Sequence, residues 1–154
     1  MISDACRYYG SALSSIVELS SGPVSIQKLS KQYAGFYLIN EFLPIYIKYS
    51  TSRRGPWTFN FQRAHQELQE SYCCSYGECM VVFVCGKDGV AALTHLDFRK
   101  VLDDFFEEQE SVTIKRKHNE MYRVRGSNGT LERKVSRNSL NEYFISKKIE
   151  HNTV

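Results

Sequence analysis

The side chains with the clearest potential for chemistry lie in one run of sequence, from Phe36 to Phe61. This run contains a lysine, a basic turn and the single tryptophan of the chain, namely Lys48, Arg53, Arg54 and Trp57. Guanidinium groups beside a lysine suit phosphate oxygens, and an exposed tryptophan can stack on a base. We therefore interpret Lys48, Arg53 and Arg54 as one candidate anion-binding patch, with Trp57 beside it.

Each of these side chains also has a purely structural interpretation, and the sequence leaves both open. Lys48 can be a solvated lysine at the end of a strand. Arg53 and Arg54 can decorate a loop. For Trp57 we favour packing in the core or at a sheet edge over stacking on a base.

A second candidate lies in the last third of the chain, where basic residues outnumber acidic ones between positions 111 and 140. Period-two alternation puts Lys115 and Lys117 on one face of a strand, and Arg123 and Arg125 on one face of the next. A short turn between the strands lets the four cations form a positive ribbon that contacts phosphates, with strong salt dependence. The alternative, which we slightly favour, is a solvated sheet face whose lysines protect an edge from aggregation.

The cysteines are odd in number and do not have the spacing of a disulfide framework: Cys6, Cys73, Cys74, Cys79 and Cys85. We expect reduced thiols, as in the cytoplasm. A metal site assembled from Cys73, Cys74, Cys79 and His65 lacks the spacing of a zinc knuckle. We therefore expect no metal and no cofactor.

Length and composition indicate one cytoplasmic domain. At 154 residues, with 42% hydrophobic and 24% charged residues, the chain suits a single globular unit. Its longest apolar run, Met80 to Cys85, is far shorter than the roughly 20 residues that cross a bilayer. We therefore expect no membrane partner. The amino-terminal residues lack the basic-then-apolar order of a secretory signal, so nothing indicates export.

The elements expected to position the candidate residues alternate between helices and strands. Helices are predicted over residues 2–17, 26–33, 60–72 and 94–106, with a last helix beginning at Ser139 and a frayed end over residues 151–154. Strands are predicted over residues 36–40, 43–50, 57–59, 80–85, 90–93, 111–117, 121–125 and 131–135. This order predicts an α/β or α+β structure, a single mixed β-sheet with helices packed on it, in one domain over residues 1–154.

The opening order of helix, three-strand meander, helix and central strand is similar to the core of the PD-(D/E)XK nuclease superfamily. There, an acid at the end of one strand and a Glu-x-Lys triplet on the next hold a divalent metal, and the lysine assists the attacking water. Here Tyr46-Ile47-Lys48 stands in the place of the triplet, and Asn40-Glu41 in the place of the first acid. The resemblance covers residues 1–86. It implies a restriction-endonuclease-like core over residues 1–94, followed by a helix and basic β-meander extension over residues 95–150.

The departures from that pattern concern the metal ligands. Hard divalent cations need several oxygen ligands, normally with one or two carboxylates, whereas Tyr46 has none and Asn40 has a neutral amide. If Asn40 pairs with Leu43 across a tight turn, Glu41 falls on the side of Lys48. One carboxylate and one lysine form an ion pair, so the resemblance implies a nuclease-like scaffold that has lost cleavage.

Three hypotheses follow. The leading one is a non-catalytic protein that binds DNA, RNA or another polyanion on a nuclease-like scaffold. The alternative is a protein-interaction module or homodimer that uses edge strands and surface aromatics. The third is a metal-dependent nuclease in which Glu41 and Lys48 act with an acid from elsewhere, such as Glu18.

Overall fold

A computed structural model of the chain describes residues 1–144. Its helices are α1 (Asp4–Leu19), α2 (Arg63–Tyr76) and α3 (His95–Val101), and residues 139–144 are also helical. Its strands are β1 (Ile26–Lys28), β2 (Phe36–Ile39), β3 (Leu43–Ser50), β4 (Trp57–Gln62), β5 (Met80–Cys85), β6 (Gly89–Thr94), β7 (Gln109–Lys115), β8 (Arg123–Gly126) and β9 (Gly129–Thr130). The end of the predicted extension, residues 145–150, and the predicted frayed end lie outside the described residues.

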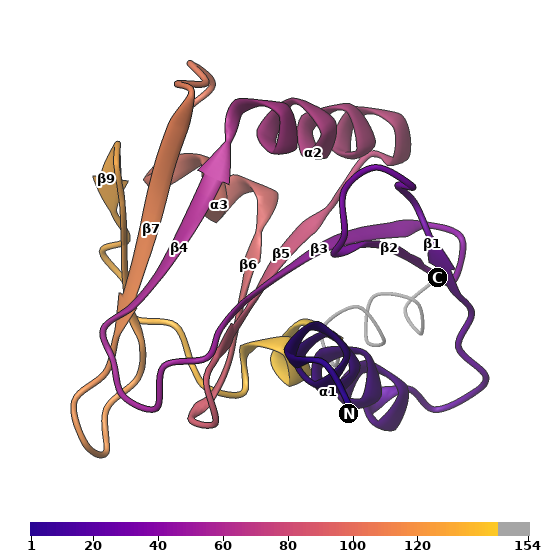
Figure 1. Cartoon of the computed structure of the whole chain (residues 1–154), viewed down its shortest axis with the longest axis horizontal. Helices are drawn as coiled ribbons and strands as arrows, with labels where there is room; N and C mark the ends of the chain where they lie inside the picture. The colour runs from indigo at the N-terminus through magenta and orange to yellow at the C-terminus, as the bar shows by residue number, and fades with distance from the viewer. Residues whose placement is uncertain (145–154) are drawn as a thin grey trace, which may run out of the picture.

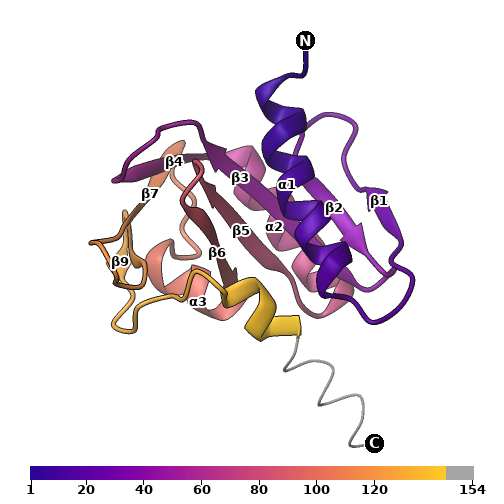
Figure 2. The same cartoon turned by 90° about the horizontal axis from the view of Figure 1, so that it is seen from below.

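The strands form two sheets. Sheet A has the order β1-β2-β3-β5-β6, with β3 and β5 parallel and the other pairs antiparallel, and sheet B has the order β4-β7-β8-β9. Helices α1 and α2 cover opposite faces of sheet A (Figures 1 and 2). The α/β class with helices packed on a mixed sheet is therefore confirmed. The expectation of one sheet is corrected, because β4 leaves the first sheet to pair with β7.

One face of sheet A packs against α1. The helix begins at Ser3, whose side chain accepts a hydrogen bond from the Cys6 N–H. Its buried Ala12 and Ile16 contact the apolar face that includes Ile45 of β3. The apolar side chains of β3 therefore pack against α1. Tyr46 and Lys48, which alternate with them, lie on the other face of the strand.

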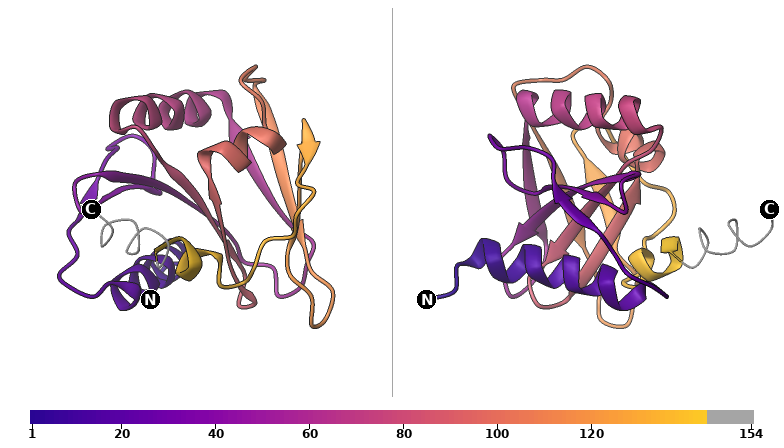
Figure 3. Two further views of the ribbon diagram at one scale, coloured as in Figure 1. Left: turned by 180° about the vertical axis from the view of Figure 1, so that it is seen from behind. Right: turned by 90° about the vertical axis from the view of Figure 1, so that its right-hand side faces the viewer.

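The opposite face of sheet A packs against sheet B, α2 and α3, and this is the larger core. Strand β4 alternates between buried and exposed residues, so its aromatics point inward and its polar residues outward. Phe59 and Phe61 on β4 meet Phe83 on β5 edge to face, with ring centres 4.9 and 6.0 Å apart. Figure 3 shows the two sheets meeting at an angle, with α2 across one end.

The helix predicted over residues 26–33 is wrong. Residues 26–28 form β1, in which Ile26 pairs with Ile39, and the chain then turns back through residues 30–35. Leu29 and Tyr33 still contact the core, but from a loop. The spacing of three to four residues between them predicted a helix, but a compact turn can also direct residues with this spacing toward the core.

The basic meander is shorter than predicted. Strands β7 and β8 begin and end within two residues of the positions predicted for the first two strands, but the strand predicted over residues 131–135 does not form, and the two-residue β9 pairs with β8 just before it. Within it only Val135 bridges, to Tyr122. No helix among residues 1–144 is long and apolar enough to span a bilayer.

Candidate functional site

Lys48 lies on β3, on the face that carries Tyr46 and is turned toward sheet B. Its ammonium nitrogen lies 5.0 Å from the centre of the Phe61 ring and 5.4 Å from the centre of the Tyr46 ring. Within residues 1–144, no carboxylate lies within ion-pair distance of this nitrogen. Two aromatic faces therefore take the place of the counter-ion that a half-buried lysine usually has.

A cavity of about 470 Å³ opens beside Lys48. It is lined by residues of α1, the loop after β1, β3 and the start of α2: Tyr9, Gln32, Tyr33, Ala34, Tyr46, Ile47, Lys48, Tyr49 and His65. The hydroxyl oxygen of Tyr46 lies 3.3 Å from Nδ1 of His65, and the Tyr33 ring packs edge-on against the His65 ring at 4.6 Å. The cavity therefore presents one amine, one imidazole and several phenols.

Burial sets the protonation of this cavity. It lowers the pKa of the Lys48 ammonium to about 8 and raises the pKa of the Tyr46 hydroxyl above its usual range. Burial, followed by the positive charge of Lys48, lowers the pKa of His65. Near neutral pH the imidazole and the phenol are thus uncharged, while Lys48 is mostly charged. A small anion is the ligand that this charge would attract.

Glu41 does not meet Lys48. Ile39, rather than Asn40, pairs with Leu43, so residues 40–42 form a three-residue turn in which Asn40 and Glu41 have φ values of 51° and 64°. Glu41 is exposed in this turn, and Lys48 lies five residues into β3, roughly 17 Å further along the strand. The expected ion pair between Glu41 and Lys48 is therefore corrected.

Trp57 is a core residue, which is the interpretation that we favoured. Its side chain is only 3% exposed, and its indole N–H donates a hydrogen bond of 2.9 Å to the carbonyl of Ser52. Its ring meets that of Tyr122 edge-on. It cannot stack on a base from this position.

The predicted positive ribbon forms on the outward side of sheet B, which we call the basic face. Lys115 pairs with Arg123, and Thr113 pairs with Arg125, so three exposed cations share one side of β7 and β8. Lys117 lies beyond the end of β7 and is also exposed. Within the described residues none of these four cations makes an ion pair.

A cavity of about 460 Å³ adjoins the basic face. It is lined by Gly55, Pro56, Lys115, Arg116, Lys117, Glu120, Met121, Arg123 and Lys134. Arg116 is engaged by Asp88 and Lys134 by Glu120, which leaves Lys115, Lys117 and Arg123 as the cations available to a ligand.

The loop between β3 and β4, residues 51–56, contributes Gly55 and Pro56 to this cavity. Arg53 and Arg54 are exposed in the same loop. Neither lines the Lys48 cavity. The single patch predicted from Lys48, Arg53 and Arg54 is therefore divided: Lys48 has its own cavity, and the loop with the two arginines borders that of the basic face.

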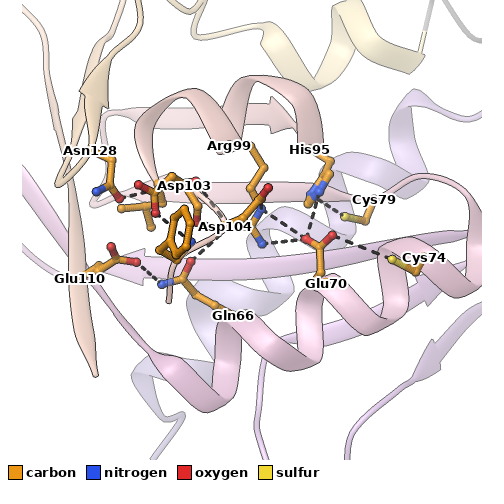
Figure 4. A network of polar contacts seen from close by, with 12 residues as sticks. Gln66, Glu70, Cys74, Cys79, His95, Arg99, Asp103, Asp104, Glu110 and Asn128 are labelled. Carbon is orange, nitrogen blue, oxygen red and sulfur yellow. Dashed lines mark hydrogen bonds and ion pairs between the residues drawn. The ribbon is translucent and has the colours of Figure 1, made fainter. Parts of the chain in front are cut away.

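The sequence interpretation missed a group near the carboxyl end of α2, which we call the thiol–imidazole cluster: Cys73, Cys79 and His95. Figure 4 shows His95 between Cys79 and Glu70, with Arg99 on the far side of Glu70. His65, which the sequence suggested as the partner of the cysteines, lies in the Lys48 cavity instead. The predicted β5–β6 hairpin contained the missing signal, because its register, Met80 with Thr94, puts Cys79 beside His95.

Comparison with known proteins adds no assignment. The sequence and structure match no protein-family profile, no curated protein and no solved structure at a significant level.

Proposed function

We propose that this protein binds the phosphate backbone of nucleic acid on the basic face, without cutting it. The observation that carries the proposal is the composition of that face. The outward residues of β4, β7, β8 and β9 are cationic or neutral polar: Thr58, Asn60, Gln62, Gln109, Ser111, Thr113, Lys115, Arg123, Arg125 and Thr130. None is acidic.

No outward residue of these strands is a carboxylate, so an anion on the strands meets no acidic side chain; Glu120, in the turn between β7 and β8, is engaged by Lys134. Glu110 belongs to β7 but is 3% exposed and accepts a hydrogen bond from Gln66 on the inner side of the sheet. Amide and hydroxyl side chains on the rest of the face can donate hydrogen bonds to phosphate and sugar oxygens. The arrangement suits an extended polyanion.

Binding without base preference is part of the proposal. No aromatic side chain projects from the outward positions of β4, β7, β8 and β9, and Trp57 is buried. Base stacking, which gives single-strand binders much of their affinity, has no platform there. We therefore expect contacts to the backbone of a duplex, with affinity set by charge and salt.

We propose binding rather than cleavage because the described residues do not form a carboxylate site for a catalytic metal ion. Metal-dependent hydrolysis of a phosphodiester needs carboxylates that converge on a cation. Within residues 1–144 the only convergent set of three potential metal ligands is the thiol–imidazole cluster, and Lys48 has no carboxylate beside it. We therefore do not propose a nuclease that uses Glu41 with Lys48. A nuclease-like ancestry of sheet A remains part of the proposal.

The test compares two double variants that lower the net charge equally. Lys115→Ala with Arg123→Ala removes a cross-strand pair of the basic face. Lys28→Ala with Lys31→Ala removes two exposed lysines, one at the end of β1, the far edge strand of sheet A, and one in the loop after it. Fluorescence anisotropy with a labelled DNA duplex, at several salt concentrations, gives the affinity and the slope of log K against log salt. We expect the first variant to reduce the steepness of the slope by about 2, and the second to leave it unchanged.

Two results would contradict the proposal. One is no binding to duplex DNA or RNA at low salt. The other is an equal effect of both double variants, since that would mean a response to net charge alone. A dimer in light scattering that persists at high salt, with no affinity for nucleic acid, would favour the interaction module instead.

A further inference from the structure

The three side chains of the thiol–imidazole cluster are spaced like the ligands of one metal ion. Sγ of Cys73, Sγ of Cys79 and one ring nitrogen of His95 all lie within 4.8 Å of one another. Sγ of Cys79 and Nδ1 of His95 are 3.5 Å apart. Two ligands at the usual zinc–sulfur and zinc–nitrogen distances, at a tetrahedral angle, are separated by roughly 3.5 Å.

Three different elements bring these ligands together. Cys73 lies in the last turn of α2, and Gly77 ends that helix with a φ of 85°, so the chain reverses toward Cys79 just before β5. His95 is the first residue of α3, and its N–H donates to the carbonyl of Cys79. An ion here would tie α2, β5 and α3 to one point.

The imidazole of His95 is held in the orientation that a ligand needs. Its Nε2 lies 3.2 Å from Oε2 of Glu70, and Nη2 of Arg99 lies 3.0 Å from the same oxygen (Figure 4). A carboxylate that accepts the Nε2–H fixes the tautomer in which Nδ1 has its lone pair toward the thiols. Arg99 balances the charge of Glu70, and its side chain is only 11% exposed.

A second observation comes from Gln69. This residue is 2% exposed, and neither its amide nitrogen nor its amide oxygen has a hydrogen-bond partner. It lies four residues before Cys73, on the same side of α2. A buried amide without a partner needs an explanation, and a metal-bound thiolate, which accepts N–H donors, supplies one.

We propose that the thiol–imidazole cluster binds one zinc ion, through Sγ of Cys73, Sγ of Cys79 and Nδ1 of His95. Two thiolates and one neutral imidazole around Zn²⁺ have no net charge, so the ion can be buried without an unpaired charge. Binding releases the two thiol protons to solvent. Water completes the tetrahedron from the side of His95, whose side chain is 24% exposed. Cys74 is exposed and stands outside the set.

The test uses the full chain, reduced and freed of metal, titrated with Co²⁺ as a spectroscopic substitute for Zn²⁺. We expect one equivalent to bind, with the thiolate charge-transfer and visible bands of a tetrahedral site, and Zn²⁺ to displace it. Cys73→Ser, Cys79→Ser and His95→Asn each remove one ligand, and we expect each to weaken Zn²⁺ binding at least 100-fold. Cys6→Ser, at an exposed cysteine of α1 outside the cluster, is the control and should bind like the wild type.

Glu70 is a positioning residue in this proposal. Glu70→Gln keeps the shape of the side chain but loses its charge. We expect it to weaken Zn²⁺ binding 10- to 100-fold while the Co²⁺ bands keep the positions given by the three ligands. A purely structural role would change stability without changing metal affinity, so urea unfolding of the metal-free protein is measured alongside.

Three outcomes would overturn the proposal: no Co²⁺ bands in the wild type, undiminished binding in both Cys79→Ser and His95→Asn, or a Cys73–Cys79 disulfide on mild oxidation in a protein whose reduced form binds no metal. Circular dichroism checks that each variant folds. If Cys79→Ser does not fold, His95→Asn, whose side chain is partly exposed, gives the answer together with the wild-type titration.

Discussion

A lysine that is half-buried without a counter-ion reduces the stability of a protein, and Lys48 is such a lysine. Its ammonium group contacts the faces of Phe61 and Tyr46, and within residues 1–144 it has no carboxylate partner. The contacts of the ammonium group with the aromatic rings compensate for only part of the solvation free energy that the group loses on burial. A residue that costs stability in this way, at the wall of a cavity, is a candidate for function.

Replacement of Lys48 by methionine should therefore stabilise the fold. Methionine keeps an unbranched chain and removes the buried charge, so we expect the free energy of unfolding to rise by about 2 kcal/mol at pH 7. The folded pKa is about 8, against an ordinary value of 10.5. The penalty is fully present below pH 8 and disappears as the pH rises toward the unfolded value. The gain from Lys48→Met should shrink over that range in urea unfolding.

Lys31→Met, at an exposed lysine, is the control for this prediction and should show neither the gain nor its pH dependence. A loss of stability in Lys48→Met that is independent of pH would mean that a stabilising partner holds the ammonium group.

At the scale of residues, strand periodicity predicted correctly which side chains share a face of β3, but it did not predict which of them lie close together along the strand. Tyr46 and Lys48 share a face, as period-two alternation requires. Glu41 was expected to meet Lys48 because both could fall on one side of the hairpin, but Glu41 lies in the turn and Lys48 five residues further along β3, so a shared side does not bring them into contact. Trp57 was assigned to the core by the general behaviour of tryptophan.

At the scale of elements, the turn between β5 and β6 joins the two sheets. Asp88 in this turn accepts hydrogen bonds from Nε and Nη2 of Arg116, at 3.0 and 2.5 Å, and from the hydroxyl of Tyr122, at 2.8 Å. Arg137 donates to the backbone carbonyl of Asp88. Arg116 follows β7, so a single carboxylate connects the tip of sheet A with the end of sheet B.

Asp88→Asn should weaken this connection. The hydrogen bonds from Arg116, followed by that from Tyr122 and by the nearby positive charges, hold the pKa of the Asp88 carboxyl below its usual range. We expect the variant to lose about 2 kcal/mol of unfolding free energy at pH 7. Because the folded pKa is lowered, the contribution is present above the unfolded value of about 4 and is lost as the pH falls through the folded value.

Urea unfolding of the wild type and of Asp88→Asn, at pH values from neutral to acid, checks this. The difference between the two should be constant near neutrality and should narrow in acid. Asp104→Asn, at a carboxylate whose side chain is 84% exposed, should change stability by less than about 1 kcal/mol. A difference for Asp88→Asn that does not change with pH would argue against the charged partnership.

Elements were predicted well where local signals agreed with tertiary contacts. The helix predicted over residues 94–106 begins as expected, because the Thr94 side chain caps it by accepting a hydrogen bond from the Asp97 N–H, but the helix ends at Val101 rather than at residue 106. Strand β4 shows the limit. A strand was predicted over residues 57–59 and a helix from residue 60, whereas the strand continues to Gln62, and the local sequence did not indicate which strand would pair with it. The distant β7, about fifty residues later, pairs with it. Pairing over such distances depends on which apolar faces can cover each other, and one strand does not determine that.

At the scale of the whole molecule, the basic face and the loop over residues 51–56 form a site to which both sheets contribute. The loop leaves sheet A at the end of β3 and enters sheet B at β4, and its Gly55 and Pro56 line the cavity with Lys115 and Lys117. If all six candidate cations reach phosphates, the slope of log K against log salt should be about −5 for duplex DNA. The six are Arg53, Arg54, Lys115, Lys117, Arg123 and Arg125.

Arg53→Ala with Arg54→Ala tests whether the loop belongs to the binding face. Each phosphate contact adds about 0.9 to the steepness of the slope, so we expect the double variant to flatten it by about 2, with little effect on stability because both side chains are exposed. Lys48→Met should leave the slope unchanged, since Lys48 lies in a separate cavity. The opposite result, a flatter slope for Lys48→Met and none for the arginine pair, would transfer the binding face from sheet B to the Lys48 cavity.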